Sequence, residues 1–180
     1  MIKAQSLVKC FGDFTALSSL DTEIHAGSIY GLVGSNGSGK STFLRLASGV
    51  YMPDGGQVTV AGEPVYENIA VKERIFFVAD DLYFLPQSTL EEMATFYKQI
   101  YRRFSDTKYK KLCTIFPLDP RQKLGTFSKG MKRQAALLLA LSCEPDLLLL
   151  DEAFDGLDPV MRGAVKKLLS DDIASREMTV

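Results

Sequence analysis

Cysteine, histidine and tryptophan are scarce in this chain of 180 residues, which contains three cysteines, one histidine and no tryptophan. The cysteines, Cys10, Cys113 and Cys143, are odd in number and widely spaced, without a Cys-x-x-Cys pair. A disulfide framework needs paired cysteines, and a zinc site needs clustered cysteines or histidines, so we expect neither. Reduced thiols in a reducing compartment are the simplest interpretation.

Long apolar runs are also missing. The longest, 135–141 and 147–150, are separated by polar and charged residues and fall short of the roughly 18 residues that a membrane span needs. The N-terminus lacks the apolar core and cleavage site of a signal peptide, so we expect a cytosolic protein. With 46% hydrophobic residues in a length close to that of one domain, the chain should bury a single core.

The formal net charge of −1 conceals a segregation of charge. Between Lys98 and Arg133 there are 11 basic and two acidic residues, so this segment carries +9 and the rest carries −10. A solvated helical face, or a patch for an acidic partner or anionic lipid, would explain it, and so would nucleic-acid binding. The basic residues are not interleaved as a recognition motif and the pI is about 5.9, so nucleic acid is not an expected partner.

Hydrophobic periodicity predicts alternating strands and helices. Strands are expected at 2–8, 28–33, 57–61, 75–79 and 147–150, and helices at 41–47, 89–112 and 128–141. A strand, a glycine-rich loop and a helix therefore follow one another near residue 40. This order favours an α/β fold.

The segment Gly34–Ser41 matches G-x-x-x-x-G-K-[ST] between a predicted strand and a predicted helix. Its glycines allow backbone N–H groups to approach phosphate oxygens closely. Lys40 is expected to reach the β- and γ-phosphates and Ser41 to ligate Mg²⁺, next to the positive helix N-terminus. The predicted phosphate-binding residues are Gly34, Ser35, Asn36, Gly37, Ser38, Gly39, Lys40, Ser41 and Thr42.

Two carboxylates, Asp151 and Glu152, follow the predicted strand 147–150. A carboxylate at the tip of a buried parallel strand can hold Mg²⁺ through its water shell, which is the role expected of Asp151. Glu152 would face the γ-phosphate and orient or deprotonate the attacking water as general base. Lys40, Asp151 and Glu152 are thus the predicted catalytic residues.

Residues 127–134, Phe-Ser-Lys-Gly-Met-Lys-Arg-Gln, resemble the signature of the ATP-binding-cassette (ABC) ATPases, with Ser128 and Gly130 retained. The resemblance extends over essentially all 180 residues in the same order. It implies one nucleotide-binding domain with a P-loop NTPase (RecA-like) α/β core, an N-terminal antiparallel β portion and an inserted α-helical subdomain. Residues 1–86 and 135–180 would form the β subdomain and core, and 87–134 the helical subdomain with the signature.

The resemblance also implies further roles. Phe11 matches the position that stacks on adenine, and Asp158 lies in a loop that crosses a dimer interface. ATP would lie between the phosphate loop of one subunit and Ser128 and Gly130 of the other. The residues alone allow simpler interpretations: Phe11 beside a turn is often a core residue, and Asp158 could cap a helix.

The Ser-Lys-Gly-Met-Lys variant resembles the exporter branch, whose membrane subunits are separately encoded. It implies an ATP-hydrolysing motor that binds ATP and Mg²⁺, works as a homo- or heterodimer and docks on integral membrane permease subunits at the inner face of the cell membrane. Two other functions fit the sequence. One is a non-transport ABC ATPase that acts on nucleic acid or the ribosome, and the other is a nucleotide-sensing module with little turnover.

Two departures from the family pattern bear on turnover. Asp80 occupies the position of a glutamine that senses Mg²⁺ and the attacking water, so the implied metal ligands are Ser41, Asp151 and Asp80; an exposed acidic turn is the alternative. The family's switch histidine should follow a later strand, and the sequence ends at Val180, before it. His25 precedes the phosphate loop and cannot replace it. We therefore expect this chain to hydrolyse ATP poorly.

Overall fold

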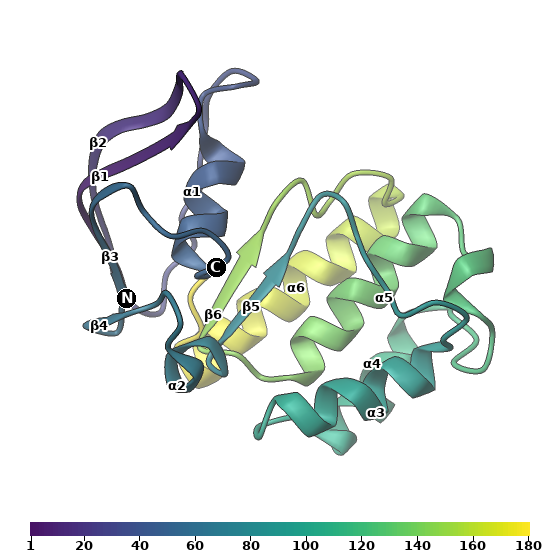
Figure 1. Ribbon diagram of the computed structural model, residues 1–180. Coiled ribbons are helices and arrows are strands. Elements are labelled where there is room, and N and C mark those ends of the chain that lie inside the picture. The colour runs from purple at the N-terminus through teal and green to yellow at the C-terminus, as the bar shows by residue number, and fades with distance from the viewer. The chain divides into compact units, whose positions relative to one another are not determined.

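The computed structural model describes residues 1–180, which divide into two compact units. Unit 1 comprises Met1–Phe77, Asp146–Leu149 and Ile173–Val180. Unit 2 comprises Val78–Pro145 and Leu150–Asp172. Their elements are labelled in Figure 1. No helix combines the length and the apolar character that crossing a membrane requires.

Unit 1 begins with an antiparallel sheet in the order β2-β1-β3-β4. Its strands are β1 (Ile2–Phe11), β2 (Phe14–Ile24), β3 (Gly55–Val60) and β4 (Glu63–Pro64). Gly12, at φ 57°, forms the tight turn that joins β1 to β2 and pairs Phe11 with Phe14. The predicted N-terminal antiparallel portion is confirmed (Figure 1).

Helix α1 (Lys40–Ala47) packs against β2 and β3, and α2 (Ile69–Lys72) follows the sheet. Alternation in β1 buries Ile2 and Ala4, while the 3.6-residue period of α1 buries Phe43 and Leu46. These side chains belong to one apolar cluster, which also contains Leu7, Leu17, Ile24, Leu44, Ala47, Val58, Val60, Val65, Val71, Ile75, Leu147 and Leu149. The cluster anchors the helix that begins at the glycine-rich loop.

Strands β5 (Ile75–Val78) and β6 (Leu147–Leu150) pair with each other. The chain end joins them, because the Leu148 N–H donates to the Thr179 carbonyl at 2.8 Å. Val180 in turn exchanges hydrogen bonds with Ser28 and Tyr30, at 2.9 and 2.8 Å. The bridge between Leu147 and Thr179 is parallel, and the pairing connects four segments of unit 1.

The expected strand at 28–33 is wrong. Its first residues pair with Val180, but the segment is not a regular strand, and the Val33 side chain is 98% exposed. A strand is defined by a ladder of backbone partners, and apolar residues alone do not supply one. The segment nevertheless leads directly into the glycine-rich loop, as expected.

Unit 2 is mainly helical. It contains α3 (Leu90–Ile100), α4 (Asp106–Ile115), the short 3₁₀ helix η1 (Leu124–Thr126), α5 (Lys129–Ser142) and most of α6 (Pro159–Arg176). The single helix expected at 89–112 is therefore two helices. Tyr101 is extended, and the Ser105 hydroxyl accepts from the Lys108 N–H at 3.2 Å, which starts a new helix.

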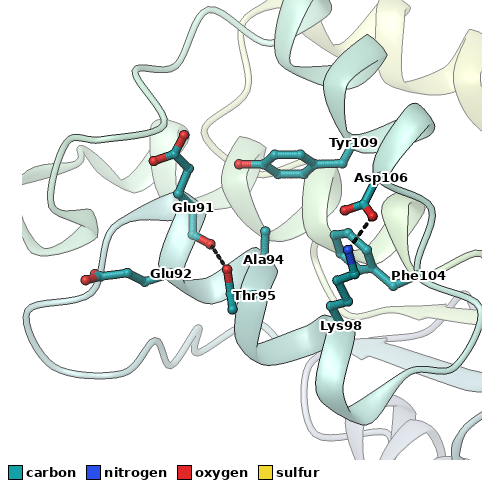
Figure 2. Close-up of a pocket in the computed structure, with 8 residues that line it drawn as sticks. All are labelled: Glu91, Glu92, Ala94, Thr95, Lys98, Phe104, Asp106 and Tyr109. Carbon is teal, nitrogen blue, oxygen red and sulfur yellow. Dashed lines mark hydrogen bonds and ion pairs between the residues drawn. The ribbon is translucent and has the colours of Figure 1, made fainter.

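Helix α5 packs against α3 and α4, and its residues from Arg133 to Ser142 are all buried. A helix that is apolar on nearly every side must be covered on every side. Figure 2 shows a pocket of about 580 Å³ between α3 and α4. The pocket is lined by Glu91, Glu92, Ala94, Thr95, Lys98, Phe104, Asp106 and Tyr109.

Alkaline pH should destabilise the helical unit. Burial raises the pKa of the Cys143 thiol above its usual 9.0 and the pKa values of Tyr97 and Tyr101 above 10.0. The unfolded chain then loses these protons first, so unfolding becomes easier as pH rises through that range, by up to about 1.4 kcal/mol per pH unit for each group. Urea unfolding at pH 7.5 and 10.5 measures the decrease. The variant Tyr101→Phe should reduce it, and an unchanged free energy of unfolding at pH 10.5 would contradict the expectation.

Candidate functional site

The glycine-rich loop Gly34–Gly39 opens helix α1 in unit 1, and Gly39 has no room for a side chain. Gly39 is the N-cap of α1 at φ 89°, and a Cβ there would lie 2.7 Å from the Ala16 carbonyl oxygen. A Cβ on Gly34 would lie 2.6 Å from Ser38 Oγ. The loop therefore keeps a bare backbone turned around the start of a helix, which is the geometry that receives a phosphate.

Lys40 is the first residue of α1, and its side chain folds back over the loop. Its Nζ donates to the carbonyls of Gly34 and Ser35, at 2.8 and 2.9 Å. An ammonium group at the loop, bare glycine backbone and a helix N-terminus are all favourable to a polyphosphate. Ser41 and Thr42 lie in the first turn of α1 beside Lys40, and the four loop residues Ser35, Asn36, Gly37 and Ser38 are exposed.

The two acids after β6 belong to unit 2 and differ in environment. Asp151 is 5% exposed, and its N–H donates to the Val78 carbonyl at 2.9 Å. Glu152 is exposed and has φ 50°, in the left-handed region that side chains adopt rarely. The sharp turn at Glu152 explains why consecutive residues can be buried and exposed. The buried acid suits a fixed ligand, whereas the exposed acid suits a group that meets solvent and substrate.

Ser128 opens α5, as its hydroxyl accepts from the Met131 N–H at 3.2 Å. Gly130, in the first turn, is pressed against a second loop of unit 2, because a Cβ there would lie 2.5 Å from the Gly156 carbonyl oxygen. Asp158 accepts from the Met161 N–H at 2.9 Å and so caps α6. The cap interpretations of Ser128 and Asp158 are therefore confirmed, and both residues remain predicted nucleotide or dimer contacts.

Asp80 follows β5 and pairs with Arg133 of α5. Arg133 Nη2 donates to Asp80 Oδ1 at 2.7 Å, and Arg133 Nη1 donates to the Ala79 carbonyl at 2.8 Å. The Asp80 side chain is 55% exposed, so its carboxylate is accessible as well as paired. Its role as an Mg²⁺ ligand stays a prediction.

Phe11 ends β1 with its side chain 44% exposed, so it is not a core residue. Tyr51 contacts it edge-on, with ring centroids 5.5 Å apart at 70°. Lys9 Nζ lies 5.5 Å from the Phe11 ring centroid. An exposed ring held by neighbours is available for stacking.

The predicted site residues are divided between the units: Phe11 and Gly34–Thr42 lie in unit 1, and Asp80, Ser128, Gly130, Asp151, Glu152 and Asp158 in unit 2. The site residues predicted from the sequence did not include Tyr51, Arg133 or Gly156. Helical spacing could have indicated Arg133, because it shares a face with the apolar Leu137 four residues later. Nothing in the sequence indicated the contacts of Tyr51 and Gly156.

The glycine-rich loop, the lysine over it and the helix behind it define a P-loop nucleotide-binding protein. The family model described as "ABC transporter" matches residues 17–155. The chain belongs to this family, among its ATP-binding subunits.

Three comparisons illustrate the relationship. The chain is 31% identical over 180 residues to the ABC transporter ATP-binding protein YtrB of Bacillus subtilis (strain 168), covering 100% of this chain and 62% of YtrB. It is 34% identical to the probable sulfate/thiosulfate import ATP-binding protein CysA of Chlorella vulgaris, covering 93% of this chain and 73% of CysA. A solved structure of an ATP-binding subunit of an ABC transporter matches with a TM-score of 0.86 at 23% identity, over 99% of this chain and 77% of the other. The fold is thus the expected P-loop α/β fold with an antiparallel sheet and a helical region.

Proposed function

We propose that this chain is the ATP-binding and ATP-hydrolysing motor subunit of an ABC exporter. The observation that carries the proposal is the glycine-rich loop, whose bare backbone and Lys40 ammonium lie at the N-terminus of α1. The family assignment and the ATP-binding relatives support ATP as the nucleotide for this loop. The chain spans 62% of YtrB, the first relative described above, so the activity of the whole protein belongs to the proposal.

In the proposed binding mode, the loop N–H groups and the Lys40 ammonium hold the β- and γ-phosphates. Lys40 exchanges its bonds to the Gly34 and Ser35 carbonyls for phosphate oxygens, so little reorganisation is needed. The Ser41 hydroxyl and the Asp151 carboxylate would hold Mg²⁺, Asp151 through water, and Asp80 is a third candidate ligand. When bound, Mg²⁺ supplies positive charge that neutralises the phosphate oxygens.

Hydrolysis needs a water molecule aligned with the γ-phosphate. Glu152 would accept a proton from this water as its oxygen forms a bond to phosphorus, while the bond from phosphorus to the leaving ADP oxygen breaks. The exposed Glu152 carboxylate is next to the buried Asp151, so the base and the metal ligand are adjacent in the chain. In this proposal Asp151 holds the metal ion and Glu152 accepts the proton.

The transport function rests on a dimer and on membrane subunits. Ser128 and Gly130 would contact the γ-phosphate of ATP that is bound to another nucleotide-binding subunit, so binding closes the pair and hydrolysis releases it. The Ser-Lys-Gly-Met-Lys signature supports an exporter with separate permease subunits. The protein would then lie at the cytoplasmic face of the membrane, bound to these subunits.

Phosphate release by the purified chain tests the proposal. If the chain is a motor, the rate of phosphate release from ATP should be proportional to the concentration of the protein. This rate should also depend on Lys40 and Glu152. A nucleotide-sensing module is the second candidate, because Asp80 stands where the family has a glutamine that senses the attacking water, and it would bind ATP without releasing phosphate. Export is tested with the permease subunits in vesicles, where ATP-driven uptake of substrate into inside-out vesicles is expected and its absence contradicts the direction.

Removal of the Phe11 ring should weaken the binding of ATP. Stacking of an aromatic side chain on a base contributes about 1–3 kcal/mol, so Phe11→Ala should raise the Kd for ATP by about 5- to 150-fold. Fluorescence titration with a labelled ATP analogue measures the change. Phe14→Ala is the control, since Phe14 pairs with Phe11 across the same hairpin and is also exposed, at 61% compared with 44% for Phe11. Equal effects of the two substitutions would rule out adenine stacking by Phe11.

A further inference from the structure

Arg133 is the most deeply buried charged residue of the helical unit. It is 1% exposed, although its neighbour Lys132 is only half-buried. A buried guanidinium cannot lose its proton and is stable only beside acceptors and a counter-charge. Asp80 supplies that charge and the Ala79 carbonyl supplies a second acceptor, at 2.7 and 2.8 Å.

The two acceptors are adjacent in the chain, and both belong to the segment that leaves β5. Arg133 donates to them with two different nitrogens, Nη1 and Nη2, so the planar guanidinium fixes the direction of the Asp80 side chain. A lysine ammonium at position 133 is a single point charge and cannot reproduce this geometry. The guanidinium therefore determines where the exposed Asp80 carboxylate lies.

The same residue belongs to the signature helix. Arg133 lies three residues after Gly130 and five after Ser128, about one turn into α5. Its side chain thus connects the first turn of α5 to Ala79 and Asp80 by two hydrogen bonds, all within unit 2. The buried Arg133 side chain therefore links the segment after β5 to the start of α5, the helix that carries the signature residues Ser128 and Gly130 at its N-terminus.

We propose that Arg133 is a positioning residue, which holds Asp80 against the start of α5 and fixes the direction of its exposed carboxylate, a candidate Mg²⁺ ligand in the proposed function. The part of the inference that concerns Mg²⁺ rests on the proposed function. The connection between Asp80 and the start of α5 rests only on the hydrogen bonds of Arg133. Arg133 does not touch nucleotide, and it acts through Asp80. If a cation attracts the Asp80 carboxylate, the resulting shift of Asp80 would be transmitted to the start of α5 through Arg133.

Hydrogen exchange without nucleotide tests the connection. In Arg133→Lys, peptides covering residues 79–86 should exchange about tenfold faster than in the unsubstituted protein, because a charge-assisted bond is lost. Lys132→Ala, on the same turn of α5, is the control and should leave these peptides unchanged. If Arg133→Lys does not fold, Asp80→Ala replaces it, since the Asp80 side chain is exposed, and peptides covering 127–132 should then exchange faster. Unchanged exchange in the variant used overturns the connection.

The Mg²⁺ dependence of phosphate release tests the positioning. Arg133→Lys and Asp80→Asn should each raise the Mg²⁺ concentration for half-maximal hydrolysis by about tenfold, while the Kd for ATP without Mg²⁺ stays the same. Because Arg133 acts through Asp80, Arg133→Lys should add no further shift in an Asp80→Asn background. Equal shifts in both backgrounds, or no shift in Asp80→Asn, overturn the proposal. A protein whose ATP binding does not depend on Lys40 would instead contradict the proposed function, and the exchange experiment distinguishes the two failures.

Discussion

Replacement of Lys40 by alanine should lower the affinity for ATP about 100-fold, so that binding at micromolar nucleotide is no longer detected. The Lys40 ammonium folds over the loop at 2.8 and 2.9 Å from two loop carbonyls, where it can exchange them for phosphate oxygens. Charge-assisted bonds to phosphate contribute about 1.5–3 kcal/mol each, which accounts for the expected loss. Isothermal titration calorimetry with ATP measures the Kd.

Lys3→Ala is a suitable control, because Lys3 is an exposed lysine of the same unit on β1. It should bind ATP as the unsubstituted protein does. Both variants should also unfold at the same urea concentration, since neither side chain belongs to the apolar cluster of unit 1. An unchanged Kd in Lys40→Ala would remove the assignment of Gly34–Ser41 as a phosphate-binding loop.

Replacement of Glu152 by glutamine should reduce phosphate release about 10²- to 10³-fold and leave ATP binding intact. Glutamine keeps the shape of the side chain but cannot take a proton from water, and a general base contributes about 10²- to 10⁴-fold. ATP should then remain bound, so a nucleotide-dependent dimer should accumulate. Single-turnover phosphate release measures the rate, and size-exclusion chromatography with ATP detects the dimer.

Glu177→Gln is the matched control for this substitution. Glu177 is also an exposed glutamate with a left-handed backbone, at φ 55° compared with 50° for Glu152. Any effect of placing glutamine on such a backbone should appear in both variants, whereas loss of the base should appear only in Glu152→Gln. Undiminished hydrolysis in Glu152→Gln would exclude Glu152 as the base.

Local patterns in the sequence predicted much of the fold. The alternation in β1, the glycine turn at Gly12 and the helical period of α1 act between near neighbours, so the sequence alone displays them. The long helix expected at 89–112 was wrong because its aromatic spacing continues through Tyr101, where the backbone is extended. The capping hydroxyl of Ser105 was the available signal for the second helix.

Predictions that depend on distant partners were less successful. The segment 28–33 has the apolar character of a strand, but its pairing depends on Val180, some 150 residues away in the chain. The ion pair between Asp80 and Arg133 likewise joins two elements that are 53 positions apart. The phosphate loop, in contrast, was recognisable because its function requires particular residues at consecutive positions.

In the proposed dimer, the close approach of Gly130 to the Gly156 carbonyl would affect how the two subunits meet. The backbones of these two loops leave no space for a side chain between them, so neither loop can move toward the other without displacing it. Ser128 lies beside Gly130, and Asp158 lies beside Gly156. In such a dimer, the contacts of Ser128 and Asp158 with a second subunit would therefore come from two loops that are packed against each other.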